Sequence, residues 1–196
     1  RAIKELNPWA IINTAGYVKV DDAETGGENE CYLSNCQGAS VLAEACADSP
    51  VKLLSFSTDL VFDGRKKKPY TESDPVSPLN TYGRSKATAE TKILQLDPDA
   101  LIVRTSGFFS PWDQYNFAFL TLKCLSDQRR VRAVNDVYVS PTYVPDLVNE
   151  CLDILLDSES GIFHLTNYGS ITWADFARKI AEKAGFDPGL VEGVPL

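Results

Sequence analysis

An apolar run, Val51-Lys52-Leu53-Leu54-Ser55-Phe56, leads directly into three polar residues, Ser57-Thr58-Asp59. A continuous run of this kind is typical of a strand that is buried on both faces of a parallel sheet. Similar runs lie at residues 9–13, 100–103 and 161–165, and stretches with helical periodicity separate them. Strands that alternate with helices predict an α/β fold, a doubly wound parallel sheet with helices on both faces.

The expected helices follow from their apolar spacing and their end signals. Asn80 or Thr81 can cap a helix that runs to about Leu94, and Thr172 can cap one that Gly185 ends. Further helices are expected at 117–125 and 145–156, and a short strand is expected at 131–134. Apolar residues at spacings of three and four also predict one helical face, made by Tyr32, Cys36, Ala39, Ala43 and Cys46. Ligands of such sheets bind beyond the carboxyl ends of the strands, which indicates residues 15–21, 57–62 and 105–112.

Composition excludes several classes of protein. The 196 residues are 44% hydrophobic and 23% charged, values of an ordinary globular chain rather than a disordered or fibrous one. The net charge of −8 argues against nucleic acid as the main partner, and we expect no membrane partner either. Five cysteines without a C-x-x-C pair favour buried thiols in a reducing compartment, so we expect a cytoplasmic protein. Because the chain has no methionine and opens within a helix-like stretch, we interpret it as an interior piece of a longer polypeptide.

Tyr82 and Lys86 stand at i and i+4 where the helix after the long loop begins, so they share one helix face. A neighbouring ammonium and the positive helix end favour phenolate, so we expect a lowered phenol pKa. Such a phenol can give a proton to a carbonyl oxygen, and the Thr58 hydroxyl can hold the same oxygen. A lone Y-x-x-x-K pattern is common by chance, but here it follows a Ser-Thr-Asp at a strand end.

That arrangement is typical of short-chain dehydrogenase/reductases, and the detailed motifs resemble one extended branch. The chain is similar to the dTDP-4-dehydrorhamnose reductase family over nearly its whole length. The motifs that carry the resemblance are Asn13-Thr14-Ala15-Gly16-Tyr17, Val20-Asp21-Asp22-Ala23-Glu24, Ser57 to Gly64, Pro69-Tyr70-Thr71-Glu72, Pro78 to Lys86, Arg104-Thr105-Ser106 and Ser140-Pro141-Thr142-Tyr143.

The resemblance implies a fold, an activity and a set of roles. The fold would be Rossmann-like, with the dinucleotide-binding part and catalytic residues at 1–106 and a mainly substrate-binding portion at 107–196. The activity would be reduction of the 4-keto group of a dTDP-4-dehydro-6-deoxysugar with NADPH or NADH. The implied catalytic residues are Thr58, Tyr82 and Lys86, where Tyr82 is the general acid and Lys86 lowers its pKa. Ala15, Gly16, Val18, Tyr82 and Lys86 would bind the cofactor, and Val20, Thr58, Asp59, Trp112 and Asn116 the sugar nucleotide.

Three departures from the family pattern stand out. The chain has no strand with a Gly-rich turn to hold the pyrophosphate, so we expect association with that missing N-terminal segment, or a homo-oligomer. Leu60 and Gly107 replace an aromatic residue and a tryptophan, and Trp112 could replace the lost ring. The alternative function is a regulatory or binding subunit that keeps the fold without turnover.

Other chemistry is less well supported. We interpret His164, the single histidine, as a core residue, and with no clustered cysteines we expect no metal site. The densest basic run, 65–68, is interpreted as a solvated loop. Two interpretations of the aromatic residues Phe108, Phe109, Trp112, Tyr115 and Phe117 stay open: core packing, or a lid over the base of the sugar nucleotide.

Overall fold

The computed structural model describes residues 2–47 and 49–196. It divides into two compact units, Arg1–Thr105 with Cys151–Leu165, and Ser106–Glu150 with Thr166–Leu196. Each unit is described by itself. Which unit holds cofactor and which holds substrate stays a prediction.

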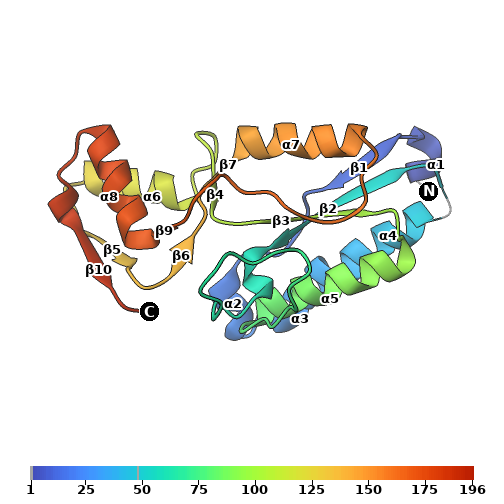
Figure 1. The fold of residues 1–196 in the computed structure, drawn as a ribbon, viewed down its shortest axis with the longest axis horizontal. Helices are drawn as coiled ribbons and strands as arrows, with labels where there is room; N and C mark the ends of the chain where they lie inside the picture. The colour runs from blue at the N-terminus through green and yellow to red at the C-terminus, as the bar shows by residue number, and fades with distance from the viewer. Residues whose placement is uncertain (1, 48) are drawn as a thin grey trace. The chain divides into compact units, whose positions relative to one another are not determined.

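The first unit is built on a four-stranded parallel sheet (Figure 1). Its strands, in spatial order, are β1 (Ala10–Asn13), β2 (Lys52–Thr58), β3 (Leu101–Thr105) and β8 (Gly161–His164). Every residue of β3 is buried, as expected of a central strand covered on both faces. The register sets Thr58 opposite Thr105 at the carboxyl ends of β2 and β3. The α/β fold with a parallel sheet is confirmed.

Two helices, α4 (Ala39–Ala47) and α5 (Thr81–Leu96), lie side by side along one face of this sheet (Figure 1). Small residues of α4 and Ile93 of α5 pack on Leu53 and Ile102 of the sheet, and together they form the main core. The last residues of α7 (Val144–Leu156), from Cys151, belong to this unit and cover the other face. Two short helices, α1 (Ala2–Leu6) and α2 (Val20–Glu24), flank β1 in the chain.

A π-helical segment corrects one sequence-based expectation. The helical face from Tyr32 to Cys46 is interrupted by π-helix at Leu33–Gly38, between α3 (Glu28–Tyr32) and α4. The wider turn shifts the phase of the helix, so Cys31 is fully buried and Tyr32 is exposed. π-helical turns occur frequently at functional sites.

The second unit consists of short strand pairs around two helices. The parallel pair is β5 (Val131–Val134) with β10 (Val191–Val194), and α6 (Phe117–Ser126) and α8 (Trp173–Ala184) pack beside it. Thr172 caps α8 and Gly185 ends it in the left-handed conformation, both as predicted. Two-residue strands, too short for a sequence pattern, form the other pairs: β4 (Phe108–Phe109) with β7 (Thr142–Tyr143), and β6 (Tyr138–Val139) with β9 (Ile171–Thr172). Across the described part of the chain, no helix is long and apolar enough to cross a membrane.

Candidate active site

Thr58 ends β2 and caps the short 3-10 turn Asp59–Val61. Its hydroxyl accepts a hydrogen bond from the Leu60 amide at 3.2 Å and donates one to Asp59 Oδ1 at 3.1 Å. The side chain is buried. The carboxyl end of a central strand therefore presents one well-oriented hydroxyl.

The start of α5 is held close to this turn. Asn80 Oδ1 caps the helix by accepting from the Gly83 amide at 2.7 Å, and the Thr81 amide donates to the Glu24 carboxylate. A Cβ on Gly83 would lie only 2.2 Å from the Leu60 carbonyl oxygen, so only glycine allows the helix to approach the turn this closely. The approach places the phenol of Tyr82 within hydrogen-bonding reach of the Thr58 side chain.

The phenol of Tyr82 does not have the lowered pKa expected from the sequence. Burial, followed by the Asp59 carboxylate, raises its pKa to about 12, although the Thr58 hydrogen bond acts in the opposite direction. Lys86 gives no compensating shift because its Nζ lies 5.9 Å from the centre of the phenol ring and is turned toward β2. At neutral pH this phenol therefore keeps its proton and can act as a donor.

Lys86 lies one turn further along the same face of α5. Its Nζ donates to the Phe56 carbonyl oxygen at 3.1 Å, which joins the helix to β2 two residues before Thr58. Burial lowers the pKa of Lys86, while Cys31 on α3 and Glu90 on α5 favour its charged form. The structure thus brings Thr58, Tyr82 and Lys86, predicted as a catalytic set, into one cluster.

Asn35 is a residue that the sequence analysis missed. Its buried amide accepts from the Tyr17 amide at 2.8 Å and donates to the Tyr17 carbonyl at 3.1 Å and to Ser85 Oγ at 3.0 Å. Ser85 Oγ in turn donates to the Tyr82 carbonyl at 2.7 Å. Asn35 therefore connects the loop after β1 to the turn of α5 that carries Tyr82. The available signal was an amide among the small apolar residues of the predicted helix face.

The loop after β1 fits the expected role in holding a dinucleotide. Gly16 lies above Lys86: a Cβ there would be 3.5 Å from Lys86 Nζ and 2.9 Å from Asn35 Oδ1. Ala15, Gly16 and Val18 are exposed, so their surface is open to a ligand beside the Lys86 ammonium. The cofactor roles of these residues remain predictions.

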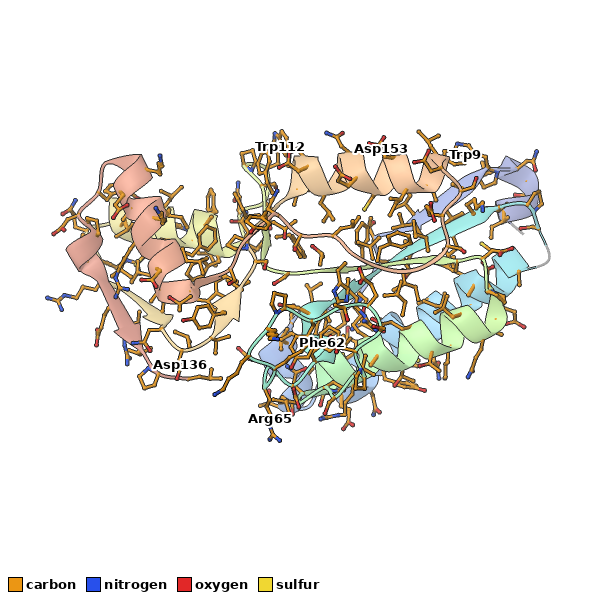
Figure 2. The ribbon with its side chains drawn as sticks, viewed as in Figure 1. Trp9, Phe62, Arg65, Trp112, Asp136 and Asp153 are labelled. Atoms are coloured by element: carbon orange, nitrogen blue, oxygen red, sulfur yellow. The ribbon has the colours of Figure 1, made fainter. Side chains whose placement is uncertain are left out.

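The predicted sugar-binding residues are divided between the units. Val20 begins α2 and Asp59 follows Thr58 in the first unit. Trp112, labelled in Figure 2, and Asn116 lie between β4 and α6 of the second unit along the chain. The Asn116 amide caps α6 and donates to the Ser110 and Asp113 carbonyls at 2.8 and 2.7 Å. Trp112 is 77% exposed. Their contact with a sugar nucleotide stays a prediction.

The aromatic residues between 108 and 117, for which the sequence leaves both core packing and a lid open, differ in their surroundings. Phe117 packs on Trp173 with ring centres 4.7 Å apart, beside the core of its unit, and Phe109 packs on Tyr143 at 5.6 Å. Trp112 and Tyr115 are 77% and 89% exposed, and Phe108 is also exposed. Only the exposed rings can act as a lid.

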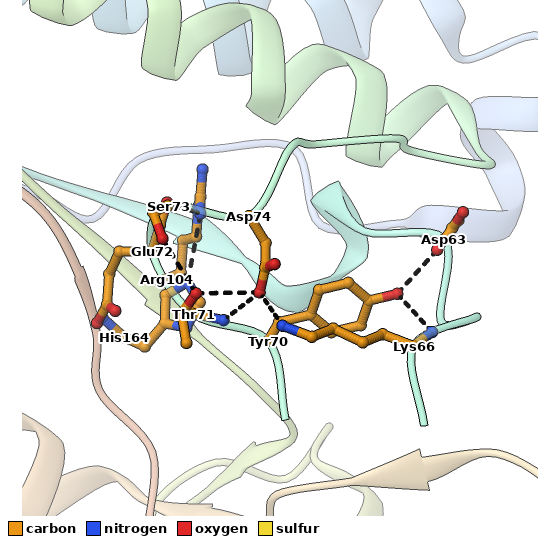
Figure 3. Close-up of polar contacts among 9 residues, drawn as sticks. All are labelled: Asp63, Lys66, Tyr70, Thr71, Glu72, Ser73, Asp74, Arg104 and His164. Carbon is orange, nitrogen blue, oxygen red and sulfur yellow. Dashed lines mark hydrogen bonds and ion pairs between the residues drawn. The ribbon is translucent and has the colours of Figure 1, made fainter. Parts of the chain in front are cut away.

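His164 is hydrogen-bonded among polar neighbours at the end of β8 (Figure 3). Its Nε2 lies 3.3 Å from Arg104 Nη1, and its backbone amide donates to Glu72 Oε1 at 2.9 Å. Burial lowers the pKa of the imidazole, Glu72 opposes this and Arg104 adds to it. No group of three metal-ligating side chains converges within residues 2–47 and 49–196.

The basic run at 65–68 is exposed at every position. Figure 2 shows Arg65 on the outside of the long loop. Lys66 pairs with Asp74, and Tyr70 closes the loop by donating to Asp63 Oδ1 at 2.8 Å (Figure 3).

Comparison with known proteins places this geometry in a family. Residues 1–196 match the RmlD substrate binding domain. The chain belongs to this family. It is 38% identical over 191 residues to a dTDP-4-keto-6-deoxy-D-glucose reductase of Streptomyces niveus, covering 96% of this chain and 65% of that protein. It is 35% identical over 190 residues to a dTDP-4-dehydrorhamnose reductase of Mycobacterium tuberculosis H37Rv, covering 94% of this chain and 62% of that protein.

Solved structures of RmlD relatives have the same fold. A dTDP-4-dehydrorhamnose reductase from Bacillus anthracis in complex with NADP superposes with a TM-score of 0.91 and 33% identity, covering 100% of this chain and 68% of that one. A homologue from Clostridium acetobutylicum gives the same TM-score at 31% identity. The chain thus spans about two thirds of the length of the relatives that it matches.

Proposed function

We propose that the polypeptide carrying this RmlD-family chain reduces the 4-keto group of a dTDP-4-dehydro-6-deoxysugar with NADPH or NADH. The observation that carries the proposal is the cluster of Thr58, Tyr82 and Lys86, in which the Tyr82 phenol reaches Thr58 and Lys86 is anchored to β2. The relatives named as reductases of such sugars, and the NADP complex of one of them, support it. We infer a cytoplasmic location because nucleotide sugars and reduced thiols are cytoplasmic.

Each residue has a role that follows from its surroundings. The Thr58 and Tyr82 hydroxyls, which lie within hydrogen-bonding reach of each other, bind the keto oxygen from two sides. Tyr82 is protonated at neutral pH because its pKa is raised to about 12, so it donates a proton to that oxygen as negative charge develops there. In the first unit Val20 and Asp59 are proposed to bind the sugar, and in the second unit Trp112 and Asn116 are proposed as further residues that bind the sugar nucleotide.

The dinucleotide supplies the hydride for the carbonyl carbon when it is bound. Ala15, Gly16 and Val18 are the residues that would hold it, through the exposed backbone of their loop. Lys86 contributes a positive charge close to Gly16, and the hydrogen bonds of Asn35 hold the loop after β1 against α5. These residues bind and orient, and Tyr82 alone moves a proton.

A turnover assay tests the proposal. The complete polypeptide is expected to consume NADPH only when a dTDP-4-keto-6-deoxysugar is present, and the product should carry a hydroxyl at carbon 4 by NMR. An open-chain ketone of similar size is the control, because it lacks the groups that the sugar-nucleotide residues recognise. Absence of turnover with every dTDP-keto sugar would contradict the proposal.

One observation favours the alternative, a non-catalytic binding subunit. Gly107 has a left-handed φ of 45°, and a Cβ there would lie 2.5 Å from Val139 Cγ2. A tryptophan there would need a shift of Val139, so this chain lacks the ring that the family resemblance implies, and that loss is what favours a subunit without turnover. A subunit of this kind would bind dTDP in calorimetry yet leave NADPH unconsumed, which separates it from the enzyme.

A further inference from the structure

Glu90 is a buried acid on the catalytic face of α5, one turn after Lys86. Its carboxylate accepts two hydrogen bonds from Arg104 of β3, from Nε at 2.9 Å and from Nη2 at 2.6 Å. Its Oε1 also accepts from the Ser57 hydroxyl of β2. The side chains of this Arg104–Glu90 ion pair are nearly fully buried, and desolvating two charges is costly. A contribution to the stability of the fold therefore does not by itself explain the pair.

The contacts of Glu90 and Lys86 fall on adjacent residues of β2. Lys86 binds the Phe56 carbonyl and Glu90 binds the Ser57 hydroxyl, directly before Thr58. Two successive turns of α5 are therefore attached to two successive residues of β2. The position of Tyr82 along β2, and hence its distance from Thr58, depends on both attachments.

Arg104 can serve as a rigid anchor because it is held from other sides as well. Its Nη1 lies 3.4 Å from the Glu72 carbonyl oxygen and 3.3 Å from His164 Nε2 (Figure 3). Its guanidinium lies 5.1 Å from the centre of the Phe62 ring. A planar fork that is fixed in this way holds a carboxylate in one orientation.

We propose that Glu90 is a positioning residue of this active site: clamped by Arg104 and Ser57, it fixes the Tyr82–Lys86 face of α5 against β2, beside Thr58. The proposal rests on the proposed reductase function for its kinetic consequence. Small misplacements of catalytic groups cost large factors in rate, so loss of the clamp should lower kcat more than it raises KM. The negative charge of Glu90 also favours the ammonium form of Lys86, as Cys31 does.

The test compares Glu90→Gln with Glu44→Gln, which removes the same charge from an exposed position on α4, in the complete polypeptide. Glu90→Gln should lower kcat by about 10- to 100-fold with little change in KM. The alkaline limb of its pH–rate profile should move to lower pH, because Lys86 then loses its proton more readily. Glu44→Gln should match the wild type in both.

A double variant separates positioning from stability. Glu90→Gln leaves Arg104 as an unpaired buried charge and should lower Tm, whereas Glu90→Gln with Arg104→Gln removes both charges and should restore Tm. The double variant should nevertheless keep the lowered kcat, since the clamp on α5 is gone. If the single variant does not fold, the double variant and Ser57→Ala carry the kinetic comparison, and Ser57→Ala is expected to lower kcat with the smaller loss of Tm that follows from removing one buried hydrogen bond.

A measurement without turnover keeps the outcomes distinct. The pH dependence of Lys86 acetylation by acetic anhydride, followed peptide by peptide by mass spectrometry, should have its midpoint at a lower pH in Glu90→Gln than in the wild type or Glu44→Gln. An inactive wild type would overturn the proposed function, and the labelling would still decide the role of Glu90. The positioning role is overturned if Glu90→Gln equals Glu44→Gln in kcat and labelling, or if the double variant regains kcat along with Tm.

Discussion

The three side chains of the proposed catalytic set, two on one turn of a helix and one at a strand end, have different environments. Tyr82 is partly buried beside a carboxylate, which keeps its proton in place, while Lys86 is partly buried near Glu90 and Cys31, which favour its charge. Thr58 is connected to the phenol of Tyr82 by a side-chain hydrogen bond. The same residue types on an open surface would have ordinary pKa values and no fixed geometry.

In the proposed mechanism the phenol of Tyr82 is the proton donor, so we expect Tyr82→Phe to lower kcat by about 10²–10⁴-fold, the usual contribution of a general acid. Tyr168→Phe is the matched control, because it removes a hydroxyl from a fully exposed ring. Steady-state kinetics on the complete polypeptide, with circular dichroism to verify folding, makes the measurement. A Tyr82→Phe variant with near wild-type turnover would rule out this mechanism.

His164 makes folding depend on pH near neutrality. Its pKa is lowered in the folded state, whereas an unfolded histidine titrates at about 6.5, so the unfolded chain binds more protons as the pH falls. The folded state therefore has its full stability above the unfolded pKa of His164. It loses stability as the pH falls from there through the lower pKa of the folded state. We expect Tm to fall from about pH 7 to about pH 5.5, and His164→Gln to flatten that slope. Since His164 is the single histidine, parallel curves for the two proteins would contradict the assignment.

At the scale of the element, α5 is the part that assembles the site. Asn80 starts it, Glu24 binds its first amide, and Gly83 lets it approach the turn after Thr58. The π-helical segment before α4 contributes Asn35, which binds Ser85 at the next turn of α5. Each contact comes from a different part of the chain, so the helix is placed by its neighbours rather than by its own propensity.

The close approach at Gly83 predicts a specific sensitivity. Gly83→Ala should cost about 1–3 kcal/mol of unfolding free energy through overpacking against Leu60, and should lower kcat further by moving Tyr82. Gly38→Ala is the control, because its Cβ would meet the Leu33 carbonyl at an ordinary 3.6 Å. Urea unfolding of both variants measures the difference. Equal stability of the two alanine variants would show that the helix can shift without cost.

At the scale of the whole molecule, the first unit has β1 as an outer strand of its sheet. Nearby apolar residues are open to solvent, with Trp9 59% and Ile12 41% exposed. Outer strands with exposed apolar side chains favour association with another strand or another chain. The relatives are longer than this chain, so a further segment of such a protein could meet this edge.

For the 196-residue chain on its own we expect self-association, and binding of NADPH at least about tenfold weaker than by the complete polypeptide, a loss of about 1.4 kcal/mol. The physical reason is that no Gly-rich turn for the pyrophosphate occurs in this sequence. Light scattering and calorimetric titration measure the two effects. A monodisperse monomer that binds NADPH as tightly as the complete polypeptide would contradict this expectation.

The sequence by itself determined the class of fold, and it predicted the catalytic set that the structure brings into one cluster. Apolar runs such as 51–56 and the caps Asn80 and Thr172 act locally, so their strands and helices could be predicted from neighbouring residues alone. In the second unit the strand at 131–134 was predicted as well, but its partner β10 and the two-residue strands were not, because each has only a few residues and depends on a distant partner. Their existence is a property of the assembled unit.

Only the tertiary structure decided how the site works. The pKa of Tyr82 rises rather than falls because burial and Asp59 outweigh a lysine turned toward Phe56, and no spacing along the chain reveals that balance. Asn35 and Glu90 reach the site through contacts 50 and 33 residues away in sequence, with Ser85 and Ser57 respectively. Desolvation and long-range hydrogen bonds depend on what surrounds a residue in space, and that becomes defined only when the chain has folded.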